Sequence, residues 1–153
     1  MTACIVAVLP LAVNVNATNW QQPKCEFQPS PVRDSTVFKG YLYNQEYDVY
    51  LNIDFYHNNV TVPHQEVYGE LPGFFGDRRD ARKWLFTDAK INNDNSATIS
   101  IINDYGSEDL TATLRVENDT TFILTQNSGS NIKIARNRKW VKMPKKLVFI
   151  KKK

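Results

Sequence analysis

Residues 48–56 read DVYLNIDFY, and the period of this stretch decides the expected fold class of the whole chain. Apolar side chains occupy every second position, whereas the positions between them are polar or carry tyrosine; the apolar set is Val49, Leu51, Ile53 and Phe55. Successive side chains of a strand point to opposite faces, so a period of two predicts a half-buried β-strand. The stretch therefore indicates a sheet that packs one face on a core.

Similar short runs lie on both sides of this stretch and are separated by turn-forming residues. The runs occupy residues 37–42, 65–71, 84–91, 97–102, 110–117, 120–126, 131–135 and 147–151, with a shorter one around Trp140. Turn residues cluster at 92–95, 104–107, 118–119 and 127–130. Helical periodicity is confined to one or two turns at 77–84. The pattern predicts an all-β protein, a single antiparallel β-barrel of about 8–10 strands, with a β-sandwich as the alternative. It does not decide whether the barrel is filled or hollow.

The first 17 residues carry no charged side chain, contain the apolar run 4–13 and end in Val15-Asn16-Ala17. This pattern is typical of a secretory signal peptide, and the apolar run is too short to span a bilayer, so no transmembrane span is expected after processing. We therefore expect a signal at 1–17, an extended arm at 18–36 with Pro23, and a barrel domain at 37–153. The expected compartment is the periplasm. Secretion, or lipid anchoring through a lipobox-like Cys4, is the alternative. Only Cys25 remains after cleavage, which excludes an intramolecular disulfide.

Charge is distributed unevenly along the chain. Residues 1–132 hold 9 Lys/Arg and 16 Asp/Glu, whereas residues 133–153 hold 10 basic residues and no acidic one. A basic patch is expected at Arg136, Arg138, Lys139, Lys142, Lys145 and Lys146. It suits an anionic envelope surface as partner, or alternatively forms a solvated face that keeps edge strands soluble. No nucleic-acid reader motif is present, so nucleic acid is not an expected partner.

The segment 71–84, LPGFFGDRRDARKW, places two aromatic residues between glycines and follows them with four cations. Aromatic residues and arginine are enriched in protein interfaces, and loops often carry function. If the segment is a long connection, its expected partner-binding residues are Phe74, Phe75, Arg78, Arg79, Arg82 and Trp84. The alternative is that the phenylalanines plug one barrel end while the arginines form surface ion pairs.

Catalytic and metal-binding candidates are few. His57 and His64 are the only histidines, and they offer a metal site only if a fold brings them together with Asp54 or Glu66. Glu66, Tyr68 and Glu70 alternate as on one strand face, but two carboxylates at this spacing lie about 13 Å apart along the backbone. No nucleophile elbow, phosphate loop or dinucleotide fingerprint occurs. We therefore expect no catalytic residue, no metal and no cofactor.

The arrangement of these runs over residues 37–151 resembles the lipocalin-like barrels of small exported bacterial proteins. The resemblance is carried by the opening Phe38-Lys39-Gly40, the successive hairpins and the closing basic strand. It implies a barrel architecture and assigns no functional residue.

These observations favour a non-catalytic exported binding protein that is not an enzyme. Its expected partner is a small apolar ligand inside the barrel or a protein at segment 71–84. Two alternatives stay open: an inhibitor or immunity protein that blocks a cell-wall-degrading enzyme, and an envelope hydrolase that uses carboxylates such as Glu66 and Glu70.

Overall fold

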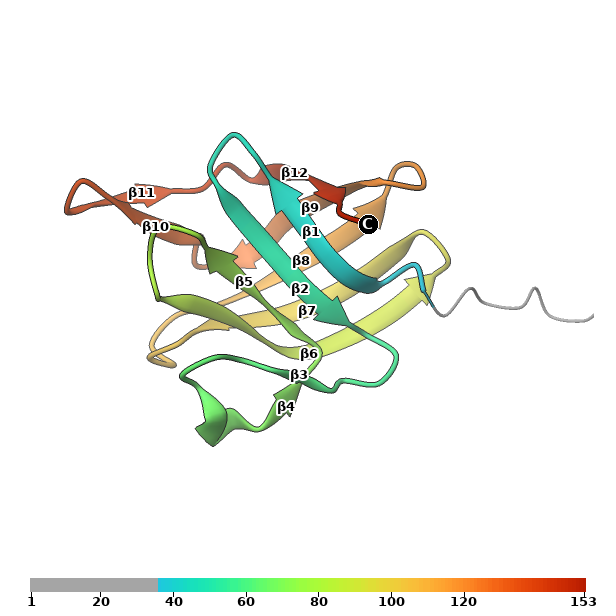
Figure 1. Cartoon of the computed structure of the whole chain (residues 1–153), viewed down its shortest axis with the longest axis horizontal. Helices are drawn as coiled ribbons and strands as arrows, with labels where there is room; N and C mark the ends of the chain where they lie inside the picture. Colours follow the sequence, from blue (N-terminus) through green and yellow to red (C-terminus); the bar gives the residue numbers. More distant parts are fainter. Residues whose placement is uncertain (1–35) are drawn as a thin grey trace, which may run out of the picture. The chain divides into compact units, whose positions relative to one another are not determined.

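Eight strands of the computed structural model close into an antiparallel barrel (Figure 1). The strands are β1 (Lys39–Asn44), β2 (Val49–Asp54), β5 (Gly73–Asp77), β6 (Lys83–Asn93), β7 (Ser96–Asn103), β8 (Asp109–Val116), β9 (Thr121–Gly129) and β12 (Lys146–Lys151). The closed barrel confirms the predicted all-β fold and its first architecture, and it excludes the sandwich.

The structure describes residues 36–153. The predicted signal at 1–17, the arm up to residue 35 and Cys25 lie outside the described residues. No helix between residues 36 and 153 is long and apolar enough to cross a membrane.

Strand order around the barrel follows the order of the chain. Each barrel strand pairs with its nearest barrel neighbours in sequence, and β1 closes the ring by pairing with β12. Two excursions interrupt this meander. One contains β3 (Val60–Thr61), a 3₁₀ turn (Glu66–Tyr68) and β4 (Glu70–Leu71); the other is the hairpin of β10 (Lys133–Arg136) and β11 (Lys139–Lys142). The barrel is therefore of the up-and-down type, with two added hairpins.

Phenylalanine rings fill the interior of the barrel. Phe75 of β5 and Phe149 of β12 meet edge to face with ring centroids 6.4 Å apart, although their strands are not neighbours. Phe38, just before β1, meets Phe122 of β9 at the same separation. All four side chains are buried. Eight-stranded barrels either hold a small ligand or fill with side chains, and this barrel is of the filled kind.

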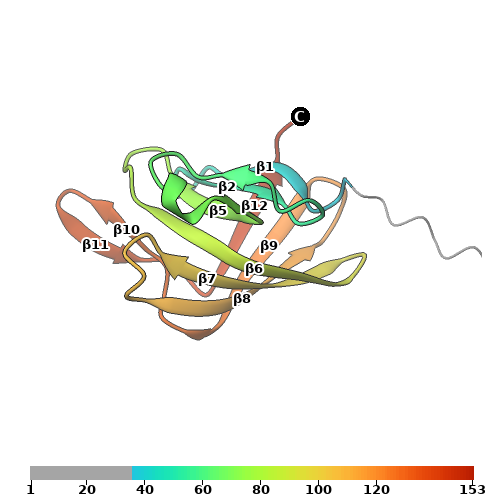
Figure 2. The same ribbon diagram turned by 90° about the horizontal axis from the view of Figure 1, so that it is seen from below.

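A second apolar cluster lies on the outer side of the barrel wall. Phe74 of β5 and Leu85 of β6 point away from the interior and pack with Val60 and Val62 of the first excursion. Figure 2 shows this excursion beside β2 and β5, whereas the β10–β11 hairpin extends beyond the ends of the barrel strands. The first excursion thus shields part of the outer wall that would otherwise expose apolar side chains.

The predicted strand at 65–71 is wrong. Residues Glu66–Tyr68 form a 3₁₀ turn, and only Glu70–Leu71 are strand. Gly69 adopts a φ of 68°, which lies outside the range of strand residues and ends any regular alternation. Glu66 and Glu70 therefore do not share a strand face, and Val67 is 89% exposed instead of facing a core.

The prediction of a long connection at 71–84 is also wrong for its first half, because Gly73–Asp77 form β5 and every residue of that strand is buried. A strand covered on both faces has no alternation, so the sequence pattern does not reveal it. The two glycines of β5 are required by close approach. A Cβ on Gly76 would lie 2.4 Å from the Tyr50 ring, and one on Gly73 would lie 2.4 Å from the Asn52 carbonyl oxygen. Residues 77–84 form no helix.

Candidate functional site

The β10–β11 hairpin forms one wall of the candidate site. Its two strands pair from Lys133 with Lys142 to Arg136 with Lys139, and Asn137 and Arg138 form the turn with φ of 51° and 64°. Positive φ at both central positions is the signature of a tight hairpin turn of the primed type, which matches the twist of the strands.

An ion pair and apolar contacts fasten this hairpin to the barrel. The guanidinium of Arg136 donates hydrogen bonds to the carboxylate of Asp77, at the end of β5, and to the carbonyl oxygen of Tyr47 at 2.6 Å. The hydrogen bonds to Asp77 raise the pKa of Arg136, so this side chain stays charged. Ile134 and Met143 are buried in the same core as the barrel interior. The hairpin is therefore a fixed wall.

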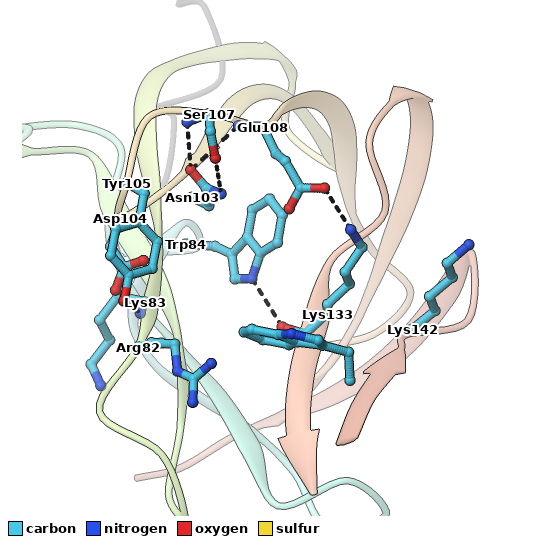
Figure 3. Close-up of a pocket in the computed structure, with 11 residues that line it drawn as sticks. Arg82, Lys83, Trp84, Asn103, Asp104, Tyr105, Ser107, Glu108, Lys133 and Lys142 are labelled. Carbon is cyan, nitrogen blue, oxygen red and sulfur yellow. Dashed lines mark hydrogen bonds and ion pairs between the residues drawn. The ribbon is translucent and has the colours of Figure 1, made fainter. Parts of the chain in front are cut away.

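A groove of about 480 Å³ lies between this hairpin and the barrel end (Figure 3). Strand alternation and register place Lys133, Trp140 and Lys142 on one face of the hairpin, and all three line the groove. Opposite them are the start of β6 and the β7–β8 turn. From these come Arg82, Lys83, Trp84, Asn103, Asp104, Tyr105, Ser107 and Glu108.

Trp84 connects the two walls of the groove. Its indole Nε1–H donates a hydrogen bond to the carbonyl oxygen of Lys133, 3.1 Å away (Figure 3). The side chain of Lys133 returns across the groove to Glu108, with 2.6 Å between the amino nitrogen and the carboxylate oxygen. These two contacts join the hairpin to the barrel end at different points and so fix the distance between the two walls of the groove.

The β7–β8 turn is ordered by its own side chains. Asn103 accepts a hydrogen bond from the backbone N–H of Ser107 at 2.9 Å, while Asp104 accepts one from the backbone N–H of Lys83 at 3.2 Å. Gly106 has a φ of 69°, which suits the left-handed turn position. As a result, Tyr105 projects from the turn and is 75% exposed.

Arg82 and Trp140 form a cation–π pair at the groove. The guanidinium carbon lies 4.4 Å from the centroid of the Trp140 ring, within the usual range for such contacts. The Nε atom of Arg82 donates to Asp80 at 3.0 Å. Burial opposes ionisation of Asp80, but the hydrogen bonds from Arg82 outweigh it and lower the pKa of the carboxyl. Trp140 is nevertheless 59% exposed, so its ring offers a surface for contact.

The walls of the groove carry an excess of positive charge. Four cations line it, Arg82, Lys83, Lys133 and Lys142, against the carboxylates of Asp104 and Glu108. Burial lowers the pKa of Lys83, although Asp77, Asp80 and Asp104 act in the opposite direction. Lys142 makes no ion pair with any residue between 36 and 153. The groove therefore suits a ligand that is polar and carries negative charge.

The six predicted partner-binding residues fall in different places. Arg82 and Trp84 line the groove. Phe74 and Phe75 are buried on opposite faces of β5, so neither is presented to a partner, because the expected loop is a strand. The remaining two, Arg78 and Arg79, lie outside the groove and pair with the carboxylate of Asp48.

The predicted basic patch is also divided. Arg136 is held inside its ion pair with Asp77, whereas the other five cations make no ion pair among the described residues. Arg138, Lys139 and Lys142 lie on the hairpin. Lys145 precedes β12, and Lys146 is the first residue of that strand. Of the five, Lys142 alone lines the groove.

The two histidines have local partners. His57 Nδ1 lies 3.0 Å from a carboxylate oxygen of Asp54, and the backbone N–H of His64 donates to Glu66 at 3.1 Å. Within residues 36–153, no group of three or more His, Cys, Asp or Glu side chains is arranged to hold a metal ion.

Sequence reasoning missed the residues that the groove gathers from distant segments. Tyr105 lies inside a turn cluster and Lys133 opens the basic segment 133–153, but Glu108 has no distinguishing signal, and nothing in the sequence indicates that the three residues meet. Their proximity depends on the hairpin contacts described above. No protein-family model matches the chain, and no curated protein and no solved structure is significantly similar to it.

Proposed function

We propose that this chain is a non-catalytic binding protein and that its binding site is the groove between the β10–β11 hairpin and the barrel end. The observation that carries the proposal is the Arg82–Trp140 pair, an exposed aromatic ring with a cation on it that lines a groove of about 480 Å³. Small-molecule sites commonly have volumes of roughly 300 to 1,000 Å³ and combine apolar walls with a few placed polar groups.

The filled barrel supports a site outside the lumen. Ring contacts such as that between Phe75 and Phe149 occupy the space that an interior ligand would need. Binding at the rim replaces the interior apolar ligand as the proposed mode. The proposal includes a lipocalin-like relationship, which the closed eight-stranded meander supports. It also includes export of the chain, which the apolar run at residues 4–13 and the following Val15-Asn16-Ala17 support.

The two carboxylates of the groove interact with neighbouring groups of the protein, which supports binding over catalysis. Glu108 is paired with Lys133, and Asp104 accepts a backbone hydrogen bond from Lys83. A general acid or base needs a carboxyl group that is able to exchange a proton with the reacting atom. Each carboxylate instead uses one oxygen in a contact that shapes the groove.

Titration of the ¹⁵N-labelled full chain with small organic anions, their neutral analogues and small organic cations tests this proposal. We expect the anions to shift the Trp140 indole N–H and the Tyr105 amide in a saturable way, and the cations to leave them unchanged. Trp140→Ala should remove the shift of the Tyr105 amide, whereas the control Val148→Ala, an exposed apolar residue of β12, should keep it. Failure of every probe to shift groove resonances would overturn the proposal.

A further inference from the structure

We infer that the ligand of the groove is an acidic saccharide, with a sugar ring packed on Trp140 and its carboxylate bound by Arg82 and Lys142. This inference rests on the proposed function and names the ligand class of the same site. It is carried by three features of the groove: exposed aromatic rings, two cations beside one of them, and carboxylate acceptors opposite.

The aromatic rings come from both walls. Trp140 of β11 is 59% exposed and Tyr105 of the β7–β8 turn is 75% exposed, and both line the groove. Each ring presents an apolar face next to a polar edge, which is the pairing that a sugar ring also offers through its C–H face and its hydroxyl rim. Large exposed aromatics in one concave site indicate a ligand that stacks.

Two cations flank Trp140. The guanidinium of Arg82 lies over the indole ring, and its Nε–H donates a hydrogen bond to Asp80. No hydrogen bond within residues 36–153 engages its two Nη atoms. A planar guanidinium with unused N–H groups is suited to a carboxylate. Lys142 is two residues from Trp140 on the same face of β11, about 7 Å along the strand, and it makes no ion pair among the described residues.

The carboxylates of the groove distinguish a hydroxylated anion from other anions. Asp104 and Glu108 line the wall opposite the hairpin, and one oxygen of each accepts no hydrogen bond from residues 36–153. Hydroxyl groups of a saccharide can donate to these oxygens. An aromatic carboxylate such as benzoate has no such donors, so it would leave both oxygens without a hydrogen bond. The mixture of cations and acceptors therefore favours a ligand that combines acid groups with several hydroxyls.

Calorimetric titration of the full chain tests the ligand class. The probes are oligomers of galacturonate, of mannuronate and guluronate, and of hyaluronan, with maltotetraose as the neutral counterpart. We expect at least one acidic oligomer to bind and maltotetraose to bind at least tenfold more weakly. Trp140→Ala should weaken binding about tenfold or more, and Arg82→Gln and Lys142→Gln about three- to tenfold each. Arg115→Gln, an exposed cation of β8 outside the groove, is the matched control and should bind as the parent does.

Three results would distinguish failure of the ligand class, failure of the inference and failure of the proposed function. If benzoate, an acidic peptide or vesicles of anionic phospholipid bind in a Trp140-dependent way and no acidic saccharide does, the ligand class is wrong while the groove remains the binding site. If acidic saccharides bind equally well to Trp140→Ala and Arg82→Gln, they bind elsewhere and the inference is overturned. If no probe responds to any groove substitution, the proposed function fails together with it.

Discussion

The guanidinium of Arg136 donates two hydrogen bonds to the carboxylate of Asp77, a residue 59 positions earlier in the chain. The pair joins the β10–β11 hairpin to the end of β5, and Asp77 is buried. Since Lys133, Trp140 and Lys142 all belong to that hairpin, this contact sets the position of one groove wall.

Breaking the Arg136–Asp77 pair should destabilise the protein. Removing one partner leaves a buried charge without compensation, so Arg136→Met is expected to lower the free energy of unfolding by about 3 kcal/mol, measured by urea denaturation. The double variant Arg136→Met/Asp77→Asn should recover part of this loss. Arg79→Met is the matched control, because it breaks an exposed pair with Asp48 and should cost far less. Equal losses in the two single variants would contradict the assignment.

The stability of the protein should fall in acid because of Asp54. Burial disfavours the charged carboxyl, but hydrogen bonds from Lys39 and His57 outweigh it and lower the pKa to about 2. A folded-state pKa below the unfolded value of 3.8 contributes stability above that value, which is lost as the pH falls towards 2.

Asp54→Asn measures this contribution. Between pH 5 and pH 2, the unfolding free energy of the parent should drop by up to about 2 kcal/mol more than that of the variant. Lys39→Gln should show an intermediate difference, because it removes one of the hydrogen bonds to Asp54. Parallel stability curves for the parent and Asp54→Asn would contradict the prediction.

Gly129 at the end of β9 should not tolerate a side chain. It has a φ of 90°, and a Cβ there would lie 2.5 Å from the carbonyl oxygen of Asp109. Gly129→Ala is expected to cost about 2 kcal/mol or more, from left-handed strain and a backbone clash together. Gly106→Ala is the comparison, since its φ of 69° imposes strain but the nearest atom is 3.9 Å away. Thermal unfolding of both variants tests whether Gly129 is the more sensitive position.

Phe75 should be among the most costly side chains to remove. It is 1% exposed and contacts Phe149 across the barrel, so Phe75→Ala leaves a cavity and should lower the unfolding free energy by about 3–5 kcal/mol. Tyr105→Ala removes a ring of similar size from the surface of the groove and should change stability by no more than about 0.5 kcal/mol. Urea denaturation of both variants checks the difference, and a small loss for Phe75→Ala would contradict a filled barrel.

Prediction from sequence succeeded where one face of a strand is buried and the other is solvated. Leu51 and Ile53 alternate with Tyr50 and Asn52 in β2, and the structure places the first pair in the core. It failed for β5, where Phe74 and Phe75 are buried on opposite faces, because neither face of that strand is polar.

The candidate site was predicted only in part. Arg82 and Trp84 were named because cations and aromatics gather in segment 71–84, and both line the groove. Lys142 of the predicted basic patch lines it as well, whereas Tyr105 and Lys133 are not among the predicted site residues. Their proximity to Trp84 comes from contacts between segments far apart in the chain, which no local pattern reveals.

The sequence by itself determined the fold class, because the period-two pattern and the turn residues act over a few positions and are legible locally. The tertiary structure alone decided that the barrel closes with eight strands, that phenylalanines fill it, and that the hairpin holding Trp140 lies against the turn holding Tyr105. These outcomes depend on strand register and on contacts such as that between Arg136 and Asp77. A local pattern states which face of a strand is buried, but the partners of that face are set by the packing of the whole chain.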